Sequence, residues 1–521
     1  MSEKAPALEL KGLTKRFGEV IANDHVDLKV EHGEILSILG ENGSGKTTLM
    51  NMISGIYFPD EGSIFIDGNE VFIASPMDAF KYHIGMIHQH FKLVDIFSAA
   101  ENIVLGLKEK GRYNIKKSAE KIRQICDLYG FDLDPDKKIY DMSVSEKQTV
   151  EILKVLYRGA DIMILDEPTA VLTPQETEKL FDVLRRMRED GKAILIITHK
   201  LNEVMELSDK VAVLCKGKYV GTVKTSETNE NQLAEMMVGK KVDLNIDRED
   251  PKNGDVRLKI KDLVIYDDYG SPVVDHVSFE AKSGEILGIA GVAGSGQREL
   301  LEAVSGLQHI RQGEIVYKDP DTGKEEILNG MNPALIQQRG IRLSFVPEDR
   351  IGMGLVGDMD IIDNMMLRSY HDGKTMFLKR DYPKELADDI IEKLEVKTPS
   401  AKTPVRMLSG GNVQKVLVGR EIAASPSVLM AAYPVRGLDI NSSYTIYNLL
   451  NEQKNAGTAV IYVGEDLDVL LELCDRIVVM CSGTVTGILN ARETSKEEIG
   501  LLMTKGKATA SVNENEEKNE V

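Results

Sequence analysis

The chain has 521 residues, 42% of them hydrophobic and 28% charged, with a formal net charge of −19. This length predicts two or three domains, and no apolar run approaches the ~18 residues that a membrane-spanning helix needs. The acidic balance disfavours a nucleic-acid binder. The four cysteines form no CxxC pair, which fits a reducing compartment and disfavours a disulfide framework or a zinc site.

The first motif that carries chemistry lies between an expected strand, Ile35–Leu39, and an expected helix, Thr47–Ile53. The intervening GENGSGKT matches the phosphate-binding P-loop pattern completely. Its glycines let successive backbone N–H groups point at phosphate oxygens, and the helix N-terminus adds partial positive charge. Lys46 is expected to reach the β- and γ-phosphates of a nucleotide. The predicted nucleotide-binding residues here are Gly40, Glu41, Asn42, Gly43, Ser44, Gly45, Lys46, Thr47 and Thr48.

Four polar residues farther along the chain are candidates for the chemistry at that loop. The apolar strand Ile162–Leu165 leads into Asp166 and Glu167. Asp166, with the Thr47 hydroxyl, is expected to hold Mg²⁺, while Glu167 polarises the attacking water. Gln89 is a candidate for contact with the metal or the water. His199, which follows the expected strand Ala193–Thr198, is a candidate γ-phosphate sensor, although a single histidine at a strand end is more often structural.

The chain also contains an internal duplication. GEILSILG at 33–40 recurs as GEILGIAG at 284–291, and Ser143 recurs as Ser409 at a slightly larger spacing. Two copies that differ by one insertion explain both spacings. Short apolar runs alternate with amphipathic helical patterns in each copy, which predicts α/β domains around a largely parallel sheet. The expected order is a first domain at 1–240, a polar linker at 241–257, a second domain at 258–505 and a disordered acidic tail at 506–521.

The order and spacing of the P-loop, Gln89, the Asp166–Thr169 run and His199 resemble the ABC ATPase family, whose signature is present as Ser409-Gly410-Gly411. The resemblance covers nearly the whole chain apart from the tail. It implies an α/β fold of two tandem ABC-type P-loop nucleotide-binding domains, each with a RecA-like core, an antiparallel β subdomain and a helical subdomain. It also implies ATP and Mg²⁺ as cofactors, catalytic roles for Lys46, Gln89, Glu167 and His199, and stacking of Phe17 on adenine.

In that family, ATP lies between the P-loop of one domain and the signature of the other. Every loss of a family residue falls on one of the two composite sites, the second phosphate loop facing the first signature. In the second copy, Gln297 and Arg298 replace Lys46 and Thr47, Ala432 and Tyr433 replace Asp166 and Glu167, and Glu465 replaces His199. In the first copy, Val144 and Ser145 replace the signature glycines. The sequence therefore predicts one hydrolytic and one degenerate site, the former completed by Ser409, Gly410 and Gly411.

A finer resemblance is to the simple-sugar import ATPases, and within them to the nucleoside-import branch, on the segments Ile87–Val94 and Glu151–Ala160. It implies an ATPase at the cytoplasmic face of the membrane that works with two transmembrane permease subunits and, indirectly, an extracytoplasmic substrate-binding lipoprotein. The segment His90–Ile103 is the expected docking region, and its aromatic residues Phe91 and Phe97 are expected either to be exposed there or to pack in a local core. Import of ribose or galactose is the alternative. A ribosomal tandem ATPase is disfavoured by the short linker, and a DNA-repair ATPase by the missing coiled coil.

Overall fold

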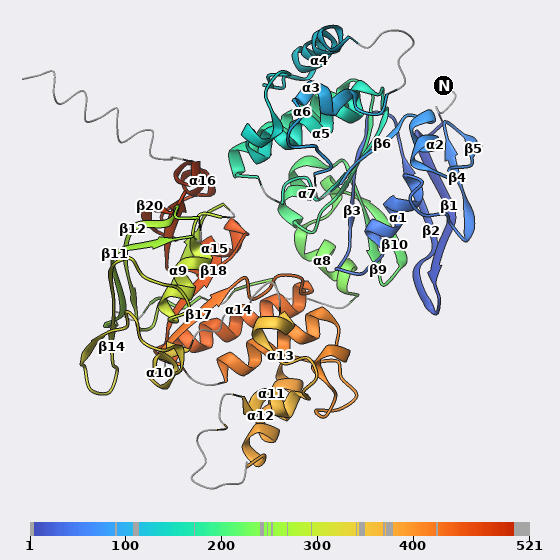
Figure 1. The fold of residues 1–521 in the computed structure, drawn as a ribbon. Helices are drawn as coiled ribbons and strands as arrows, with labels where there is room; N and C mark the ends of the chain where they lie inside the picture. Colours follow the sequence, from blue (N-terminus) through green and yellow to red (C-terminus); the bar gives the residue numbers. More distant parts are fainter. Residues whose placement is uncertain are drawn as a thin grey trace, which may run out of the picture. The chain divides into compact units, whose positions relative to one another are not determined.

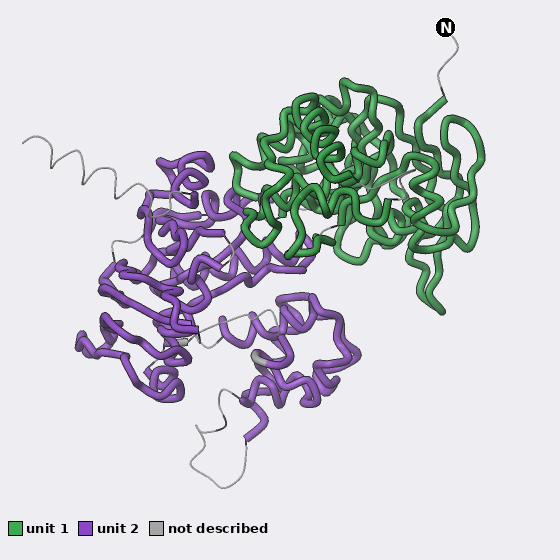
Figure 2. The backbone as a smooth tube through the Cα atoms, turned by 45° about the horizontal axis from the view of Figure 1, so that its top comes forward, with its two compact units in different colours: residues 1–243 green, residues 244–521 purple. Residues whose placement is uncertain are grey.

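The computed structural model divides the chain into two compact units, Met1–Asp243 and Leu244–Val521 (Figure 2). The described residues are 5–88, 91–107, 114–170, 172–239, 244–246, 248–251, 254–267, 269–292, 294–339, 341–342, 350–367, 370, 379–423 and 426–504. Gln89, His90 and the expected tail lie outside these ranges. In these ranges, no helix combines the length and the apolarity needed to cross a bilayer.

Unit 1 contains one ten-stranded sheet in which a parallel core continues into an antiparallel edge (Figure 1). Every residue of three central strands, β3, β7 and β8, is buried, as expected for parallel strands that helices cover on both faces. The strand order is β5 (Asn69–Val71), β4 (Glu61–Ile66), β1 (Leu8–Phe17), β2 (Val20–Val30), β10 (Lys218–Lys224), β9 (Lys210–Cys215), β3 (Ile35–Leu39), β8 (Ala193–Ile197), β7 (Ile162–Asp166) and β6 (Ile84–Ile87).

Three helices of unit 1, α3, α4 and α5, pack on one another around a small core of their own that includes Ile103, Ile122 and Leu153. They form the helical subdomain, and the antiparallel edge of the sheet forms the β subdomain. The helices of the unit are α1 (Lys46–Ile53), α2 (Pro76–Lys81), α3 (Ala99–Val104), α4 (Ile115–Tyr129), α5 (Val144–Tyr157), α6 (Pro174–Glu189), α7 (Leu201–Leu207) and α8 (Glu230–Val238).

Unit 2 repeats this plan with its strands in two sheets. One sheet has the order β12 (Pro272–Lys282), β11 (Val256–Tyr266), β14 (Gln312–Lys318) and β15 (Glu325–Ile327). The other has the order β16 (Ile341–Arg342), β17 (Val428–Ala432), β18 (Ala459–Val463), β13 (Ile286–Ala290), β19 (Arg476–Cys481) and β20 (Thr484–Asn490). The helices are α9 (Gln297–Val304), α10 (Pro333–Gln338), α11 (Ile361–Met366), α12 (Asp381–Lys393), α13 (Gly410–Ile422), α14 (Ile440–Asn455), α15 (Leu467–Leu473) and α16 (Lys496–Thr504).

The duplication extends to individual hydrogen bonds. In unit 1, the Asp209 carboxylate accepts the Ile35 amide at 2.9 Å, and in unit 2 Asp475 accepts the Ile286 amide at 2.8 Å. Each aspartate directly precedes a strand, β9 in unit 1 and β19 in unit 2. Its hydrogen bond ties the start of that strand to the strand before the glycine-rich loop. The prediction of two tandem α/β domains is confirmed.

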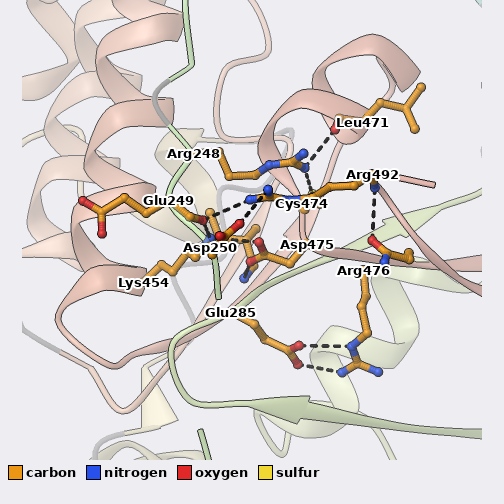
Figure 3. Close-up of polar contacts among 12 residues, drawn as sticks. Arg248, Glu249, Asp250, Glu285, Lys454, Leu471, Cys474, Asp475, Arg476 and Arg492 are labelled. Carbon is orange, nitrogen blue, oxygen red and sulfur yellow. Dashed lines mark hydrogen bonds and ion pairs between the residues drawn. The ribbon is translucent and has the colours of Figure 1, made fainter. Parts of the chain in front are cut away.

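The chain enters unit 2 through a segment that packs against the body of that unit (Figure 3). The Arg248 guanidinium donates to the carbonyl oxygens of Leu471, at 2.9 Å, and Cys474, at the end of α15. A cation there satisfies carbonyls that the helix leaves without partners. The Glu249 carbonyl accepts from the buried Lys454 ammonium at 2.7 Å. Part of the expected linker 241–257 is therefore ordered on unit 2, and β11 begins at Val256.

Candidate functional site

The P-loop of unit 1 connects the buried strand β3 to helix α1, as the sequence predicts. Gly45 has a φ of 97°, in the left-handed region that favours glycine. A Cβ at this position would lie 2.2 Å from the Ala22 carbonyl oxygen and 2.7 Å from the Asn23 amide nitrogen. Asn23, which is fully buried, donates to the Gly45 carbonyl at 3.2 Å. The antiparallel β2 strand therefore fixes the exit of the loop, a contact that the sequence did not predict.

Lys46 is the first residue of α1, at the end of this loop, and is 7% exposed. Its ammonium donates to the carbonyl oxygens of Gly40 at 2.6 Å and Glu41 at 2.9 Å. Burial lowers the pKa of Lys46, and the nearby carboxylates of Glu167 and Asp166 oppose that effect. Both acceptors of the ammonium are neutral carbonyl oxygens. An anion such as a phosphate would accept a stronger, charge-assisted hydrogen bond from Lys46.

The loop also contains a buried polar atom without a partner. The Ser44 hydroxyl oxygen has no hydrogen-bond partner in the described part of the chain, although it is buried. Buried polar groups are normally satisfied, so an orphaned one indicates a missing ligand. Thr47, in the first turn of α1, is exposed, and Thr48 is half-buried. An orphaned hydroxyl, a lysine and a helix N-terminus fit a bound polyphosphate with its metal ion.

Two carboxylates follow each other at the end of β7 and have opposite titration behaviour. Burial raises the pKa of Asp166 to about 6, the Glu167 charge adds to this, and Lys46 opposes it. The hydrogen bond from His199 lowers the pKa of Glu167, against the effect of burial. Asp166 is therefore partly protonated around pH 6, whereas Glu167 stays ionised and able to accept a hydrogen bond from water.

His199 and Glu167 form a direct pair, with 3.0 Å between the imidazole Nδ1 and the carboxylate Oε1. Glu167 has a φ of 46°, and its amide donates to the Ile197 carbonyl at 2.9 Å. That turn directs the end of β7 toward the end of β8, where His199 follows. The sequence predicted both residues but not their contact. The structure therefore brings together Lys46, Asp166, Glu167 and His199.

Phe17, the predicted adenine contact, ends β1 and is 46% exposed. Its ring meets the Tyr57 ring edge-on, with 5.3 Å between the centroids and 73° between the planes. Tyr57, which follows α1, is itself partly exposed, so the two rings offer an aromatic surface beside the P-loop helix. Tyr57 was not predicted, because it lies 40 positions along the chain and no local pattern links it to Phe17.

The predicted Gln89 lies outside the described residues, and so does His90. In the expected docking segment, Phe91 and Phe97 are half-buried, between the two alternatives of exposure and local core packing. The apolar exposure is instead at Ile96, which is 70% exposed, and at Val94. The most exposed apolar side chains of this segment are therefore β-branched and not aromatic.

The two signature segments differ in how their helices begin. In unit 1, the Ser143 hydroxyl accepts the Glu146 amide, and Glu146 accepts the Ser143 amide at 2.8 Å. This capping box, whose carboxylate also pairs with Lys137, closes the helix N-terminus to another anion. In unit 2, α13 begins at Gly410 without a side-chain cap, and the Ser409 hydroxyl accepts from Asn412 at 2.8 Å. The amides at the start of α13 remain available for an anion.

The second glycine-rich loop fills the lysine position with a neutral side chain. Gln297, at the start of α9, is 3% exposed, and its amide donates to the Val292 carbonyl at 3.3 Å. Arg298 forms an ion pair with Glu302 of the same helix at 2.7 Å. At the end of β17, Tyr433 adopts a φ of 50°, yet Ala432 and Tyr433 supply no carboxylate. This loop therefore has the geometry of the first one without its charged groups.

The chain also matches a known protein family and several known proteins. The model of the family described as "ABC transporter" matches residues 23–170 and 274–434. The chain is 39% identical over 504 residues to the nucleoside import ATP-binding protein NupA of Lactococcus lactis subsp. cremoris, covering 96% of this chain and 98% of the relative. It is 42% identical to the guanosine import ATP-binding protein NupO of Bacillus subtilis, covering 95% and 97%.

A third relative, the ribose import ATP-binding protein RbsA of Clostridium tetani, is 38% identical over 507 residues, which cover 95% of this chain and 97% of the relative. The identity is therefore similar for relatives named after nucleosides and after a sugar. Both halves of the chain match the family, and the P-loop with its charged partners lies in the first half. The chain therefore belongs to the ABC transporter family, as an ATPase that carries two copies of the family's nucleotide-binding domain.

Proposed function

We propose that this protein hydrolyses ATP at one composite site and thereby drives import of nucleosides through separate permease subunits. Lys46, Asp166, Glu167 and His199 of unit 1 form one face of that site. By resemblance to the family, the signature of unit 2, Ser409, Gly410 and Gly411, would complete that site. The observation that carries the proposal is the division of features between the copies: the charged catalytic group is in unit 1, and the uncapped helix N-terminus is in unit 2.

The residues would act in the following way. Lys46 exchanges its two carbonyl partners for phosphate oxygens, and the Ser44 hydroxyl gains an acceptor. Glu167, held by His199, accepts a hydrogen bond from the attacking water and orients it in line with the leaving group. Mg²⁺, when bound, offsets the charge that develops on the phosphate oxygens. Thr47, Asp166 and Gln89 would hold the ion, and Phe17 would stack on adenine.

The second site would bind nucleotide at most, without turnover. Gln297 occupies the lysine position in a neutral form, and no carboxylate stands at the end of β17. Ser295 and the backbone amides of the loop are retained. We further propose the domain order 1–240, linker 241–257, 258–505 and tail 506–521. The protein would act at the cytoplasmic face of the membrane with two transmembrane permeases and an extracytoplasmic substrate-binding lipoprotein, and it would bind no nucleic acid.

A nucleoside is the proposed substrate class because two relatives with near full-length coverage are named for nucleoside or guanosine import. Ribose or galactose is the alternative, since a relative named for ribose import is 38% identical. Uptake by cells lacking the chain, restored by its expression, would discriminate the two. Restored uptake of labelled guanosine that unlabelled ribose does not compete supports the proposal, and the reverse competition contradicts it.

The test of the site is ATP turnover by the chain assembled with its permeases. Glu167→Gln should abolish turnover, because the water loses its hydrogen-bond acceptor. The matched change in the other copy, Gln297→Lys with Arg298→Thr, should alter turnover by less than about twofold, since the acidic pair is still missing there. Turnover that survives Glu167→Gln would mean that another base acts, and the assignment would fail.

A further inference from the structure

Arg350 lies next to the signature in unit 2, although it is far from it in sequence. It begins a single π-helical turn, Arg350–Gly354, and its guanidinium fits between two glycines. A Cβ added to Gly410 would come 2.9 Å from the Arg350 Nη1, and one added to Gly437 would come 3.0 Å from Nη2. The absence of side chains at these two positions therefore lets the guanidinium approach both backbones.

The same guanidinium makes a directed contact with the loop that follows β17. Its Nη2 donates to the Arg436 carbonyl at 2.7 Å. Burial lowers the pKa of Arg350, and the neighbouring charge of Arg436 adds to that effect. Across the described ranges, no carboxylate forms an ion pair with Arg350. The guanidinium thus lies close to the start of α13 and donates a hydrogen bond to the loop after β17.

The backbone that carries Arg350 is itself fixed to the signature helix. The Leu355 amide donates to the Arg350 carbonyl at 2.9 Å and closes the turn. Arg420, a buried residue of α13, donates to the Gly354 carbonyl at 2.8 Å. The Gly357 carbonyl, three residues after Gly354, accepts from the amide of Arg406 at 3.0 Å. Arg406 itself lies just before the signature. The position of the guanidinium is therefore set by the helix that it contacts.

A second side chain makes a parallel connection in unit 2. Gln414 of α13 is fully buried, and its amide donates to the carbonyl oxygens of Tyr433 at 3.2 Å and Pro434 at 2.7 Å. In unit 1, the equivalent residue is Gln148 of α5, whose side-chain amide nitrogen has no hydrogen-bond partner in the described part of the chain. The hydrogen bonds between α13 and the loop after β17 are thus found in the unit whose signature helix is uncapped.

We propose that Arg350 is a positioning residue for hydrolysis, which holds Ser409–Gly411 and the loop at Arg436–Gly437 at a fixed separation. This inference rests on the proposed function of the composite site. The open amides of α13 stabilise a developing charge only when they are already oriented, because reorientation during the reaction has a cost in free energy. Arg350 supplies that orientation through its Nη2 hydrogen bond to the Arg436 carbonyl, while its Nη1 lies close to the backbone of Gly410.

The test measures ATP turnover by the full chain with its permeases for Arg350→Lys and Arg350→Gln. A displacement of about 1 Å at a reacting centre can lower the rate by ~100-fold. We therefore expect kcat to fall at least about tenfold in both variants, while the affinity of a fluorescent ATP analogue stays within about twofold. The matched control is Arg406→Gln, three residues before the signature, whose exposed ion pair with Asp358 should leave kcat unchanged.

Parental kcat in Arg350→Lys would overturn the inference, because a charge would then suffice without the fork. Parental kcat in both variants would overturn it as well. Gly437→Ala adds a methyl group beside Nη2 while it keeps the arginine, so it should also lower kcat. The combination with Arg350→Lys should cost little more than either change, since both remove one contact. Additive losses would contradict this. Failure of the proposed function is distinguishable, because turnover would then survive Glu167→Gln.

Discussion

The raised pKa of Asp166 leads to a prediction about stability that does not depend on transport. The carboxyl ends β7, is 8% exposed and has a pKa of about 6, compared with 3.8 for an ordinary aspartate. The folded protein therefore binds more protons than the unfolded chain between these two values. By linkage, stability falls as the pH rises through this window, and above pH 6 the ionised carboxylate weakens the fold.

Asp166→Asn removes this cost because it replaces the carboxylate by a neutral group of the same shape. A pKa increase from 3.8 to about 6 corresponds to about 3 kcal/mol at ~1.4 kcal/mol per pKa unit. For a unit of roughly 240 residues, we expect the melting temperature to rise by about 6–12 °C at pH 8. The gain should shrink toward zero near pH 4. Thermal unfolding of the full chain in EDTA without nucleotide measures both effects.

The control is Asp439, a half-buried aspartate whose pKa shifts in the opposite direction. Burial raises the pKa of Asp439, but the hydrogen bonds from the hydroxyl and the amide of Ser442 lower it. Together the lowering effects outweigh burial, so the pKa lies below its ordinary value. Asp439→Asn should therefore destabilise at pH 8 and lose its effect as the pH falls. In saturating Mg²⁺ and ATP, the parent should gain more stability than Asp166→Asn. The reasoning would be refuted if the Asp166→Asn protein were no more stable than the parent at pH 8. It would also be refuted if the stability gain of the variant were as large at pH 4 as at pH 8.

Three further predictions concern the P-loop, the adenine contact and the buried ion pair between Lys454 and Asp475. Gly45→Ala forces a Cβ against the Ala22 carbonyl at φ 97°, so it should lower stability by more than about 2 kcal/mol in urea unfolding; Gly43→Ala, with open space around it, should cost about 1 kcal/mol. Phe17→Ala should weaken ATP binding by about 5- to 150-fold in titrations, from the loss of ~1–3 kcal/mol of stacking, with kcat at saturation retained; unchanged affinity would remove Phe17 from the site. Lys454→Met leaves the buried Asp475 carboxylate without its cation at 2.9 Å, so unfolding should require about 3–5 kcal/mol less. Asp475→Leu in addition should recover only part of this, because the Ile286 amide also loses its acceptor.

The sequence was informative where function depends on residues that are close in the chain. GENGSGKT specified a strand, a loop and a helix, and the structure has β3 and α1 at those places. The repeated GEIL segments predicted two similar halves, and the pairs formed by Asp209 and Asp475 agree down to single hydrogen bonds. Local pattern and backbone geometry are tightly coupled in such motifs, which is why they can be read directly.

Contacts that depend on how distant segments approach one another could not be predicted. The pairing of His199 with Glu167 depends on the order of β8 and β7 in the sheet. Arg248 was expected in a linker because its neighbours are polar, but its partners are carbonyl oxygens, which no side-chain pattern reveals. Arg350 likewise depends on two glycines, and the vacant space that a glycine leaves has no signal in sequence until the fold is known.

The left-handed bend at Glu167 recurs at Tyr433, with φ values of 46° and 50°. Both amides donate to the end of the neighbouring strand, to Ile197 at 2.9 Å and Val463 at 2.8 Å. A bulky residue held in this conformation costs about 1–3 kcal/mol, and unit 2 retains it without any catalytic carboxylate to direct. The bend is thus architecture that both halves share, separable from chemistry. An engineer who wished to restore a second hydrolytic centre could begin with side chains alone on a backbone that already turns the right way.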